Sequence, residues 1–126
     1  MAPLPLQVTF RDMDPSDSVR ARIEKRARKL RLFHPRVESC RVVVRAPHQH
    51  KHHGRLYNVR IDLKVPRRAI VINRASSARQ SHADIYVAVR DAFNALDRRL
   101  EDVARRGRGE MKRHSLHVED RPERQR

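Results

Sequence analysis

The stretch Ser81–Arg106, SHADIYVAVRDAFNALDRRLEDVARR, predicts a long amphipathic helix. Its apolar residues recur at steps of three and four, which forms one stripe: Ile85, Val89, Ala92, Phe93, Leu96, Leu100 and Val103. Ser81 and Asp84 have the spacing of a capping box, and no Gly or Pro interrupts the pattern before Gly107. Because such a stripe must be covered, the rest of the chain is expected to supply a sheet or a partner helix.

A second helix is predicted nearer the N-terminus. Asp14 suits the N-cap, Pro15 the first helical position and Asp17 the first turn. The helix is expected to end by His34, because Pro35 disfavours helical geometry in the residue before it. The inward stripe is Val19, Ile23, Ala27 and Leu30, with Phe33 near its edge.

Four segments have the composition or the alternation of β-strands: Leu4–Phe10, Val37–Ala46, Leu56–Val65 and Ala69–Asn73. Cys40, Val42, Val44 and Ala46 in the second segment are expected to face the helices, as are Tyr57, Val59, Ile61, Leu63 and Val65 in the third. The opposite face carries Arg41, Arg45, Arg60 and Lys64 and can be wet. Pro66, Arg67 and Arg68 are expected to form a turn.

This order predicts an α+β fold, β-α-β-β-β-α, with two helices packed on one face of a four-stranded mixed sheet. A helix between the first two strands implies a parallel pair, whereas the next two connections are short enough for antiparallel hairpins. We expect one domain over residues 1–108 and a flexible basic tail over residues 109–126, where the periodicity is lost.

The composition points to a polyanionic partner. Thirty Lys and Arg residues against fifteen Asp and Glu give a net charge of +15, and excess charge of this size repels itself in the folded state. The charge is spread through the predicted helices and strands as well as the ends, which argues against a mere solubility device or basic tail. We therefore favour nucleic acid as the partner, with an anionic membrane surface as the second choice. Neither a membrane span nor a signal peptide is expected, and the single Cys fits a reducing cytoplasm.

The first predicted helix carries what we call the cationic ridge, which consists of Arg22, Lys25, Arg28 and Lys29. Helical geometry places these residues on the side away from the apolar stripe. An ordinary solvated face mixes signs to gain i,i+4 pairs, whereas only Asp17 and Glu24 oppose the basic residues of this helix. The cationic ridge therefore favours contact with RNA phosphates. In the long helix, basic residues alternate with carboxylates, so a stabilising role explains each of them as well as a binding role does.

Catalytic and metal-binding patterns are weak. His48, His50, His52 and His53 lie in a predicted loop without a thiol or carboxylate to complete a rigid metal site. Cys40 is expected to be buried and inert. We find no phosphate-cradling Gly loop, nucleophile elbow or metal-protease helix. We therefore expect no enzyme, no metal, no cofactor and no small-molecule substrate.

Few aromatic residues are available for stacking, which favours docking on the backbone of preformed RNA over base recognition.

The chain contains the stretches LQVTFRDMDPSDSVRARIEKRARKLRLF, SCRVVVRAPHQHKHHGRLYNVRIDLKVP and DIYVAVRDAFNALDRRLED. From about Leu6 to about His114 it resembles the hibernation-promoting factor family, which includes ribosome-associated inhibitor A. The resemblance implies the fold predicted above and a cytoplasmic protein, monomeric in isolation. It also implies binding to the small ribosomal subunit and its 16S-type ribosomal RNA, in the channel that messenger and transfer RNA would otherwise occupy. Ribosomes would thereby be silenced and protected during stress or stationary phase.

By position, the resemblance implies that the cationic ridge faces ribosomal RNA, together with Arg90 and Arg98 of the long helix. Arg45 and Lys64 complete our set of candidate contacts. Long members of the family add a C-terminal dimerisation domain, which this chain is expected to lack. Where relatives often have a glycine turn after the third strand, this chain has Pro66, Arg67 and Arg68. A related subgroup has a similar His-rich loop and an RRGRGEMKRH-like end.

Two other hypotheses remain open. The first is a general double-stranded or structured RNA-binding module, although such modules carry a lysine cluster at the start of the last helix, where this chain has the acidic Asp84. The second is an enzyme or metal-dependent sensor that uses the His-rich loop.

Overall fold

The computed structural model describes residues 4–46, 57–74 and 84–114, with side chains in the last range described up to residue 107. The elements are β1 (Leu6–Arg11), α1 (Asp17–Phe33), β2 (Ser39–Arg45), β3 (Asn58–Val65), β4 (Arg68–Arg74) and α2 (Ile85–His114). This order confirms the predicted α+β fold.

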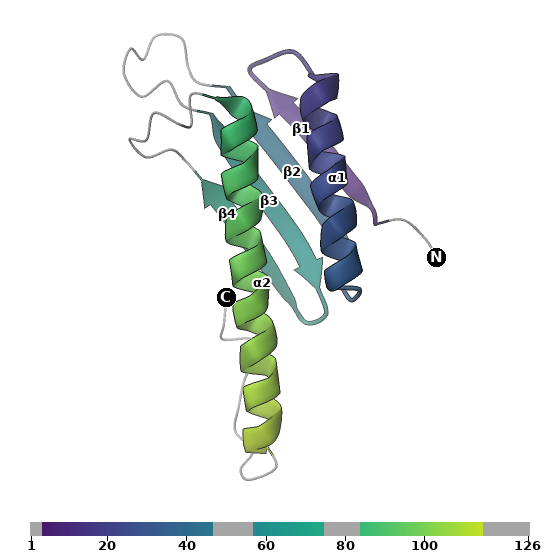
Figure 1. Ribbon diagram of the computed structural model, residues 1–126, viewed down its shortest axis with the longest axis vertical. Helices are drawn as coiled ribbons and strands as arrows, with labels where there is room; N and C mark the ends of the chain where they lie inside the picture. Colours follow the sequence, from purple (N-terminus) through teal and green to yellow (C-terminus); the bar gives the residue numbers. More distant parts are fainter. Residues whose placement is uncertain (1–3, 47–56, 75–83, 115–126) are drawn as a thin grey trace.

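The sheet has the order β1-β2-β3-β4, with β1 parallel to β2 and the other two pairs antiparallel. Both helices cover the same face of the sheet, as predicted (Figure 1). The register aligns one aliphatic row across all four strands on the covered face: Val8, Val42, Ile61 and Ile72. The neighbouring row, on the open face, consists of Thr9, Val43, Arg60 and Asn73. The alternation read from the sequence therefore separates an apolar face from a basic one.

The core lies between the sheet and the two helices. The side chains of Val19, Ile23, Ala27 and Leu30 are buried from α1, which confirms the predicted stripe. The sheet supplies Cys40, Val42, Val44, Val59, Ile61, Leu63, Val65 and Ile70, and α2 supplies Ala88, Val89, Ala92, Phe93, Leu96 and Leu100. Each large aliphatic side chain that is buried in this way contributes about 1.5–3 kcal/mol. Aliphatic burial thus carries most of the stability, as the composition indicates.

The structure corrects the N-terminal end of α1. The N-cap is Ser16, whose Oγ accepts a hydrogen bond from the backbone N–H of Val19 at 3.3 Å, so the predicted cap Asp14 lies outside the helix. A hydroxyl at this position reaches the third helical N–H, which satisfies one of the otherwise free donors of the first turn. The helix ends at Phe33 with His34 as its C-cap, as expected. Phe33 is 70% exposed and does not flank the core, because it is the last helical residue.

The bounds of α2 also differ from the prediction. Asp84 precedes the helix and its Oδ1 accepts a hydrogen bond from the N–H of Tyr86 at 2.9 Å, so Asp84 is the cap and not the third helical residue of a capping box. Ser81 lies outside the described residues. At the other end the helix continues past Gly107 to His114 and projects beyond the sheet (Figure 1). Each of the two helical glycines, Gly107 and Gly109, costs only about 1 kcal/mol, and good helix formers such as Met111 and Lys112 follow them. The first residues of the predicted tail are thus helical, and residues 115–126 lie outside the described chain.

Candidate nucleic-acid interface

The cationic ridge lies on the outer surface of α1. Arg22, Lys25, Arg28 and Lys29 are all exposed, because the buried stripe on the opposite side of the helix holds α1 against the sheet. Within the described parts of the chain, no ion pair engages any of these four side chains. Their charges are therefore available to an external anion.

One ridge residue is oriented by α2. The Cζ atom of Arg22 lies 4.6 Å from the centroid of the Tyr86 ring, and the Tyr86 hydroxyl shares a 2.6 Å hydrogen bond with the hydroxyl of Ser18. A guanidinium stacked on an aromatic face keeps its N–H edge free to donate. The contact between the two helices therefore fixes the orientation of the Arg22 guanidinium on the surface of α1.

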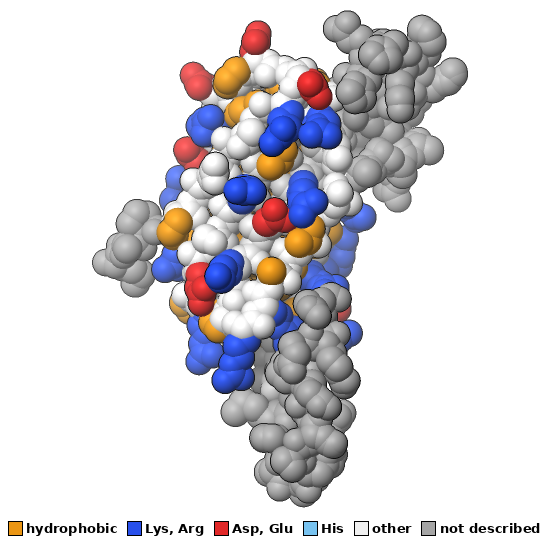
Figure 2. All heavy atoms as spheres, turned by 180° about the vertical axis from the view of Figure 1, so that it is seen from behind, with side chains coloured by type: hydrophobic (Ala, Val, Ile, Leu, Met, Phe, Trp, Pro, Cys, Tyr) orange, Lys and Arg blue, Asp and Glu red, His pale blue; other side chains and the backbone are white. Residues whose placement is uncertain are grey.

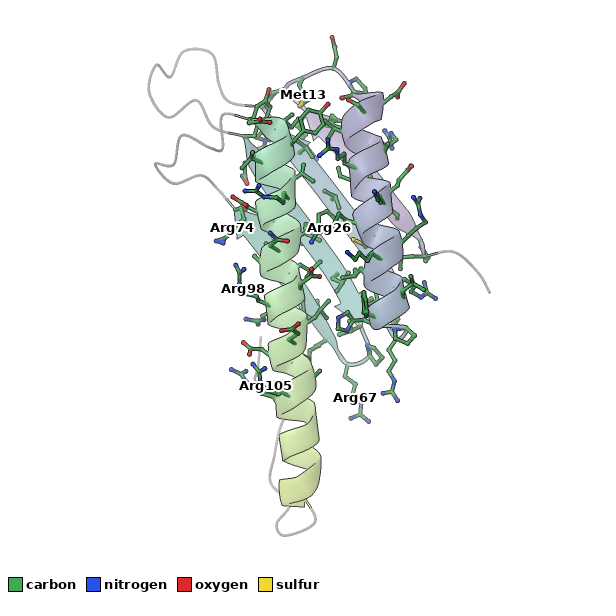
Figure 3. All side chains as sticks on the ribbon, viewed as in Figure 1. Met13, Arg26, Arg67, Arg74, Arg98 and Arg105 are labelled. Atoms are coloured by element: carbon green, nitrogen blue, oxygen red, sulfur yellow. The ribbon has the colours of Figure 1, made fainter. Side chains whose placement is uncertain are left out.

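Arg26 has a structural role beside the ridge. Its Nη2 donates to Asn94 Oδ1 at 3.0 Å and to Asp97 Oδ2 at 3.1 Å, and its Cζ lies 5.3 Å from the centroid of the Phe93 ring. Figure 3 shows Arg26 directed from α1 towards α2. This arginine links the two helices, and Asp97 of α2 is thereby occupied.

The basic residues of α2 are more closely balanced by carboxylates. Arg90 and Arg98 are exposed, but Arg90 forms an ion pair with Asp91 at 3.2 Å. Further along the helix, Arg105 pairs with Asp102. The outer surface of α2 thus adds less net charge than that of α1, although both helices lie in the same layer over the sheet (Figure 1).

The remaining two candidates, Arg45 and Lys64, lie on the open face of the sheet, on the other side of the molecule. The structure therefore does not bring the eight candidate residues together. The basic side chains of this open face are Arg11, Arg41, Arg45, Arg60 and Lys64, and Figure 2 shows Lys and Arg spread over it. Two carboxylates partly balance them, since Arg60 pairs with Asp62 at 3.1 Å and Arg45 with Asp12 at 3.8 Å.

The sequence prediction left Arg11 outside the first strand. The first strand was predicted to end at Phe10, whereas β1 includes Arg11, which lies directly beside Arg45 in the parallel register. The sequence did indicate the longer strand, because Arg11 continues the alternation of Gln7 and Thr9. Its proximity to Arg45 depends on the register, which the pattern of one strand does not define.

Cys40 is a poor candidate for a nucleophile. Its side chain is buried, and burial raises the pKa of the thiol from 9.0 to about 12, with a further contribution from the negative charge of Asp62. The thiolate is the reactive form, so the native thiol is almost entirely unreactive at neutral pH.

We expect alkylation of Cys40 at pH 8 to be about 10³-fold slower in the native protein than in the unfolded chain, from the difference in thiolate fraction alone. Because the folded pKa lies above the unfolded one, the contribution of this thiol to stability is complete below pH 9 and is lost as the pH rises towards 12. Labelling rates with and without guanidinium, followed by mass spectrometry, measure the first effect. Equal rates would show that the thiol is accessible and ionised in the fold.

The predicted loop that contains His48, His50, His52 and His53 lies outside the described residues. In residues 4–46, 57–74 and 84–107, no three His, Cys, Asp or Glu side chains are grouped closely enough to hold a metal ion. None of the described helices combines the length and the apolar composition needed to cross a membrane.

Residues 6–108 match the protein family described as Sigma 54 modulation protein / S30EA ribosomal protein. A solved ribosomal subunit interface protein from Coxiella burnetii has a similar fold, with a TM-score of 0.63 and 17% identity over 79% of this chain and 96% of that one. The N-terminal domain of Protein Y from Thermus thermophilus gives a TM-score of 0.57 and 15% identity over 79% of this chain and 97% of that one. At these identities the likeness concerns the fold alone. No curated protein matches the sequence.

Proposed function

Because the chain belongs to the Sigma 54 modulation protein / S30EA ribosomal protein family, we propose that it binds the small ribosomal subunit and inhibits translation. The protein occupies the channel that messenger and transfer RNA would otherwise enter, under stress or in stationary phase. The inhibition is steric and involves no catalysed reaction. The observation that carries this proposal, beside the family, is the cationic ridge of four exposed side chains without ion pairs in the described chain.

The ridge supplies affinity through counterion release. Each phosphate that a Lys or Arg side chain neutralises contributes about 0.9 to the slope of log K against log salt, which corresponds to about fivefold in affinity at 0.15 M salt. Four contacts from Arg22, Lys25, Arg28 and Lys29 therefore contribute about 10³-fold. Arg90 and Arg98, both exposed on α2, add further contacts to 16S-type ribosomal RNA.

The start of α2 argues against a general double-stranded RNA-binding module. That fold requires basic side chains at the start of its last helix, whereas Asp84 accepts a backbone hydrogen bond there and caps α2. We therefore favour a cytoplasmic, monomeric protein whose target is the assembled subunit.

Sedimentation through sucrose gradients tests the proposal. We expect the protein to travel with small subunits and to prevent them from binding messenger and transfer RNA. A free RNA duplex of equal concentration should compete poorly. Equal affinity for the duplex would instead support the general RNA-binding module, and unimpeded messenger binding in the presence of bound protein would contradict steric inhibition.

A further inference from the structure

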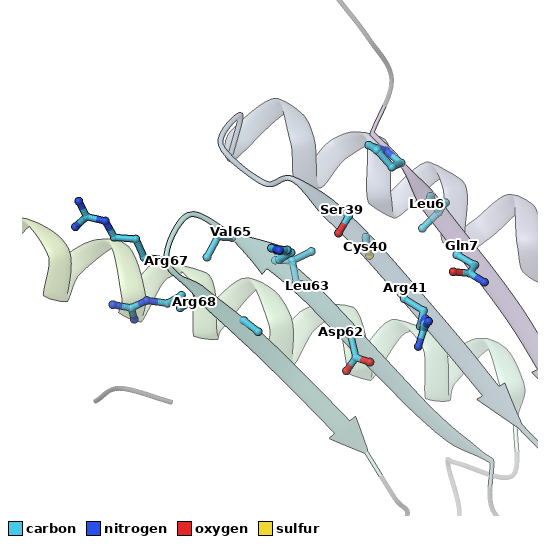
Figure 4. A pocket seen from close by; sticks show the side chains of 13 residues that line it. Leu6, Gln7, Ser39, Cys40, Arg41, Asp62, Leu63, Val65, Arg67 and Arg68 are labelled. Carbon is cyan, nitrogen blue, oxygen red and sulfur yellow. The ribbon is translucent and has the colours of Figure 1, made fainter. Parts of the chain in front are cut away.

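The open face of the sheet has a shallow hollow at the end where β3 turns into β4. The hollow has a volume of about 910 Å³ and crosses all four strands (Figure 4). Its polar lining includes Gln7 from β1, Ser39 and Arg41 from β2, Lys64 from β3, and Arg67 and Arg68 at the turn. It lies on the opposite side of the sheet from α1 and its cationic ridge.

The hollow has an excess of positive charge. Arg41, Lys64 and Arg67 supply cationic side chains to its lining, and Asp62 is the one carboxylate among its lining residues. Asp62 already accepts a hydrogen bond from Arg60 Nε at 3.1 Å, which offsets its charge. Arg41, Lys64 and Arg67 are exposed. An anion that entered the hollow would therefore meet several cations and no free carboxylate of the lining.

The turn beside the hollow has an unfavourable residue for its backbone. Pro66 and Arg67 connect β3 to β4, and Arg67 has a φ of 70°. Residues with a Cβ rarely adopt this left-handed conformation, whereas glycine adopts it freely. Arginine at such a position is a conformational disadvantage, and strain of this kind is commonly found where a side chain has a function.

We propose that the hollow is a second RNA-binding site, which holds a stretch of sugar–phosphate backbone with Arg41, Lys64 and Arg67 as phosphate ligands. This inference rests on the proposed function, since it assumes that the partner is RNA. Arg41 lies on β2, Lys64 on β3 and Arg67 at the turn into β4, and with neighbouring strands about 4.8 Å apart these cations are spread across about 10 Å of the sheet. That spread suits consecutive phosphates of a strand better than the compact phosphates of a free nucleotide.

The consequence is that the protein contacts RNA on two opposite sides. The cationic ridge faces one RNA surface and the hollow faces another, with the sheet and helix layers between them. Occupying a cleft lined by RNA on both sides gives two sets of contacts from one small domain, and each set adds its own counterion release.

The test compares Arg41→Gln, Lys64→Gln and Arg67→Gly, singly and combined, with Arg11→Gln as a matched control. Arg11 lies on the same face and carries the same charge, but it does not line the hollow. Affinity for small subunits is measured at several salt concentrations. We expect the triple variant to bind about 100-fold more weakly at 0.15 M salt, with a salt slope lower by about 3. The control should change the affinity less than twofold.

Arg67→Gly separates binding from folding. We expect it to raise the Tm by about 2–5 °C, because it relieves the positive φ, and to weaken RNA binding about fivefold. A variant that is both more stable and a weaker binder cannot owe its weaker binding to unfolding. A lower Tm, or an unchanged affinity, would overturn the role of Arg67.

The outcomes are distinguishable from failure of the proposed function. If the triple variant binds subunits like the wild type while ridge variants do not, the hollow is not an RNA site and the proposed function stands. If the wild type does not bind subunits, both proposals fail. A titration of the protein with a nucleoside triphosphate alone tests the remaining possibility, that the ligand is a free nucleotide. Micromolar affinity that is lost in the triple variant would assign the hollow to a free nucleotide and overturn the proposal.

Discussion

The variant with Arg22, Lys25, Arg28 and Lys29 all changed to Glu is expected to lose binding to small ribosomal subunits while keeping its circular dichroism spectrum. Loss of four phosphate contacts alone lowers affinity about 10³-fold at 0.15 M salt, and the four new carboxylates add repulsion. The fold should persist, because all four side chains are exposed and none belongs to the core. Co-sedimentation at moderate salt measures the effect.

A charge-preserving variant is the matched control for this experiment. Exchanging Lys and Arg at the same positions, as Arg22→Lys, Lys25→Arg, Arg28→Lys and Lys29→Arg, keeps the net charge and should retain most of the binding. Among these four residues, and within the part of the chain that the structure describes, only Arg22 has a stacked contact, with Tyr86, that lysine would not reproduce. Continued pelleting of the Glu variant with subunits would exclude the ridge as the contact surface.

Phe93→Ala is expected to destabilise the protein by about 3–5 kcal/mol, since it removes a large buried ring and leaves a cavity. Phe93 is 0% exposed and heads the fully buried side chains by volume. Its ring also lies under the guanidinium of Arg26, so the substitution weakens the link between the helices. For a domain with a typical stability of about 5–15 kcal/mol, this loss is a large fraction of the total. Urea unfolding measures the change.

Phe33→Ala is the control for Phe93→Ala, because it removes the same side chain from a site that is 70% exposed. The expected change is within about 0.5 kcal/mol. The sequence placed both phenylalanines on or near an apolar stripe, and only the structure distinguishes them. Equal destabilisation by the two variants would mean that the last turn of α1 is packed against the rest of the fold.

Local pattern was sufficient for the order of the elements and for the buried faces. Val19, Ile23, Ala27 and Leu30 repeat at helical steps, and the alternation from Asn58 to Val65 separates two faces of a strand. The helix ends were less well predicted. Asp14 and Ser16 are both good caps, and the choice between them depends on where the chain leaves β1. Gly107 does not end α2, which also continues through Gly109, because each helical glycine costs only about 1 kcal/mol beside good helix formers.

The candidate site was predicted residue by residue and not as a surface. Helical periodicity correctly predicted that the side chains of the cationic ridge are exposed, since their positions depend on one helix alone. The grouping of all eight candidates was not predictable, because Arg45 and Lys64 are separated from the ridge by the thickness of the sheet and the helix layer. Arg26 has the same charge as its neighbours in the sequence, yet its partners Asn94 and Asp97 lie on another helix.

The sequence by itself determined the α+β fold, the strand pairing and the strongly basic character, because each follows from spacing and composition within short segments. Tertiary structure alone decided which charges are free, which are used to join helices, and which gather around the hollow beside Arg67. The physical reason is that charge–charge and charge–ring contacts depend on distances of a few ångströms between segments far apart in the chain. Those distances are defined only once the sheet register and the seating of the helices are established.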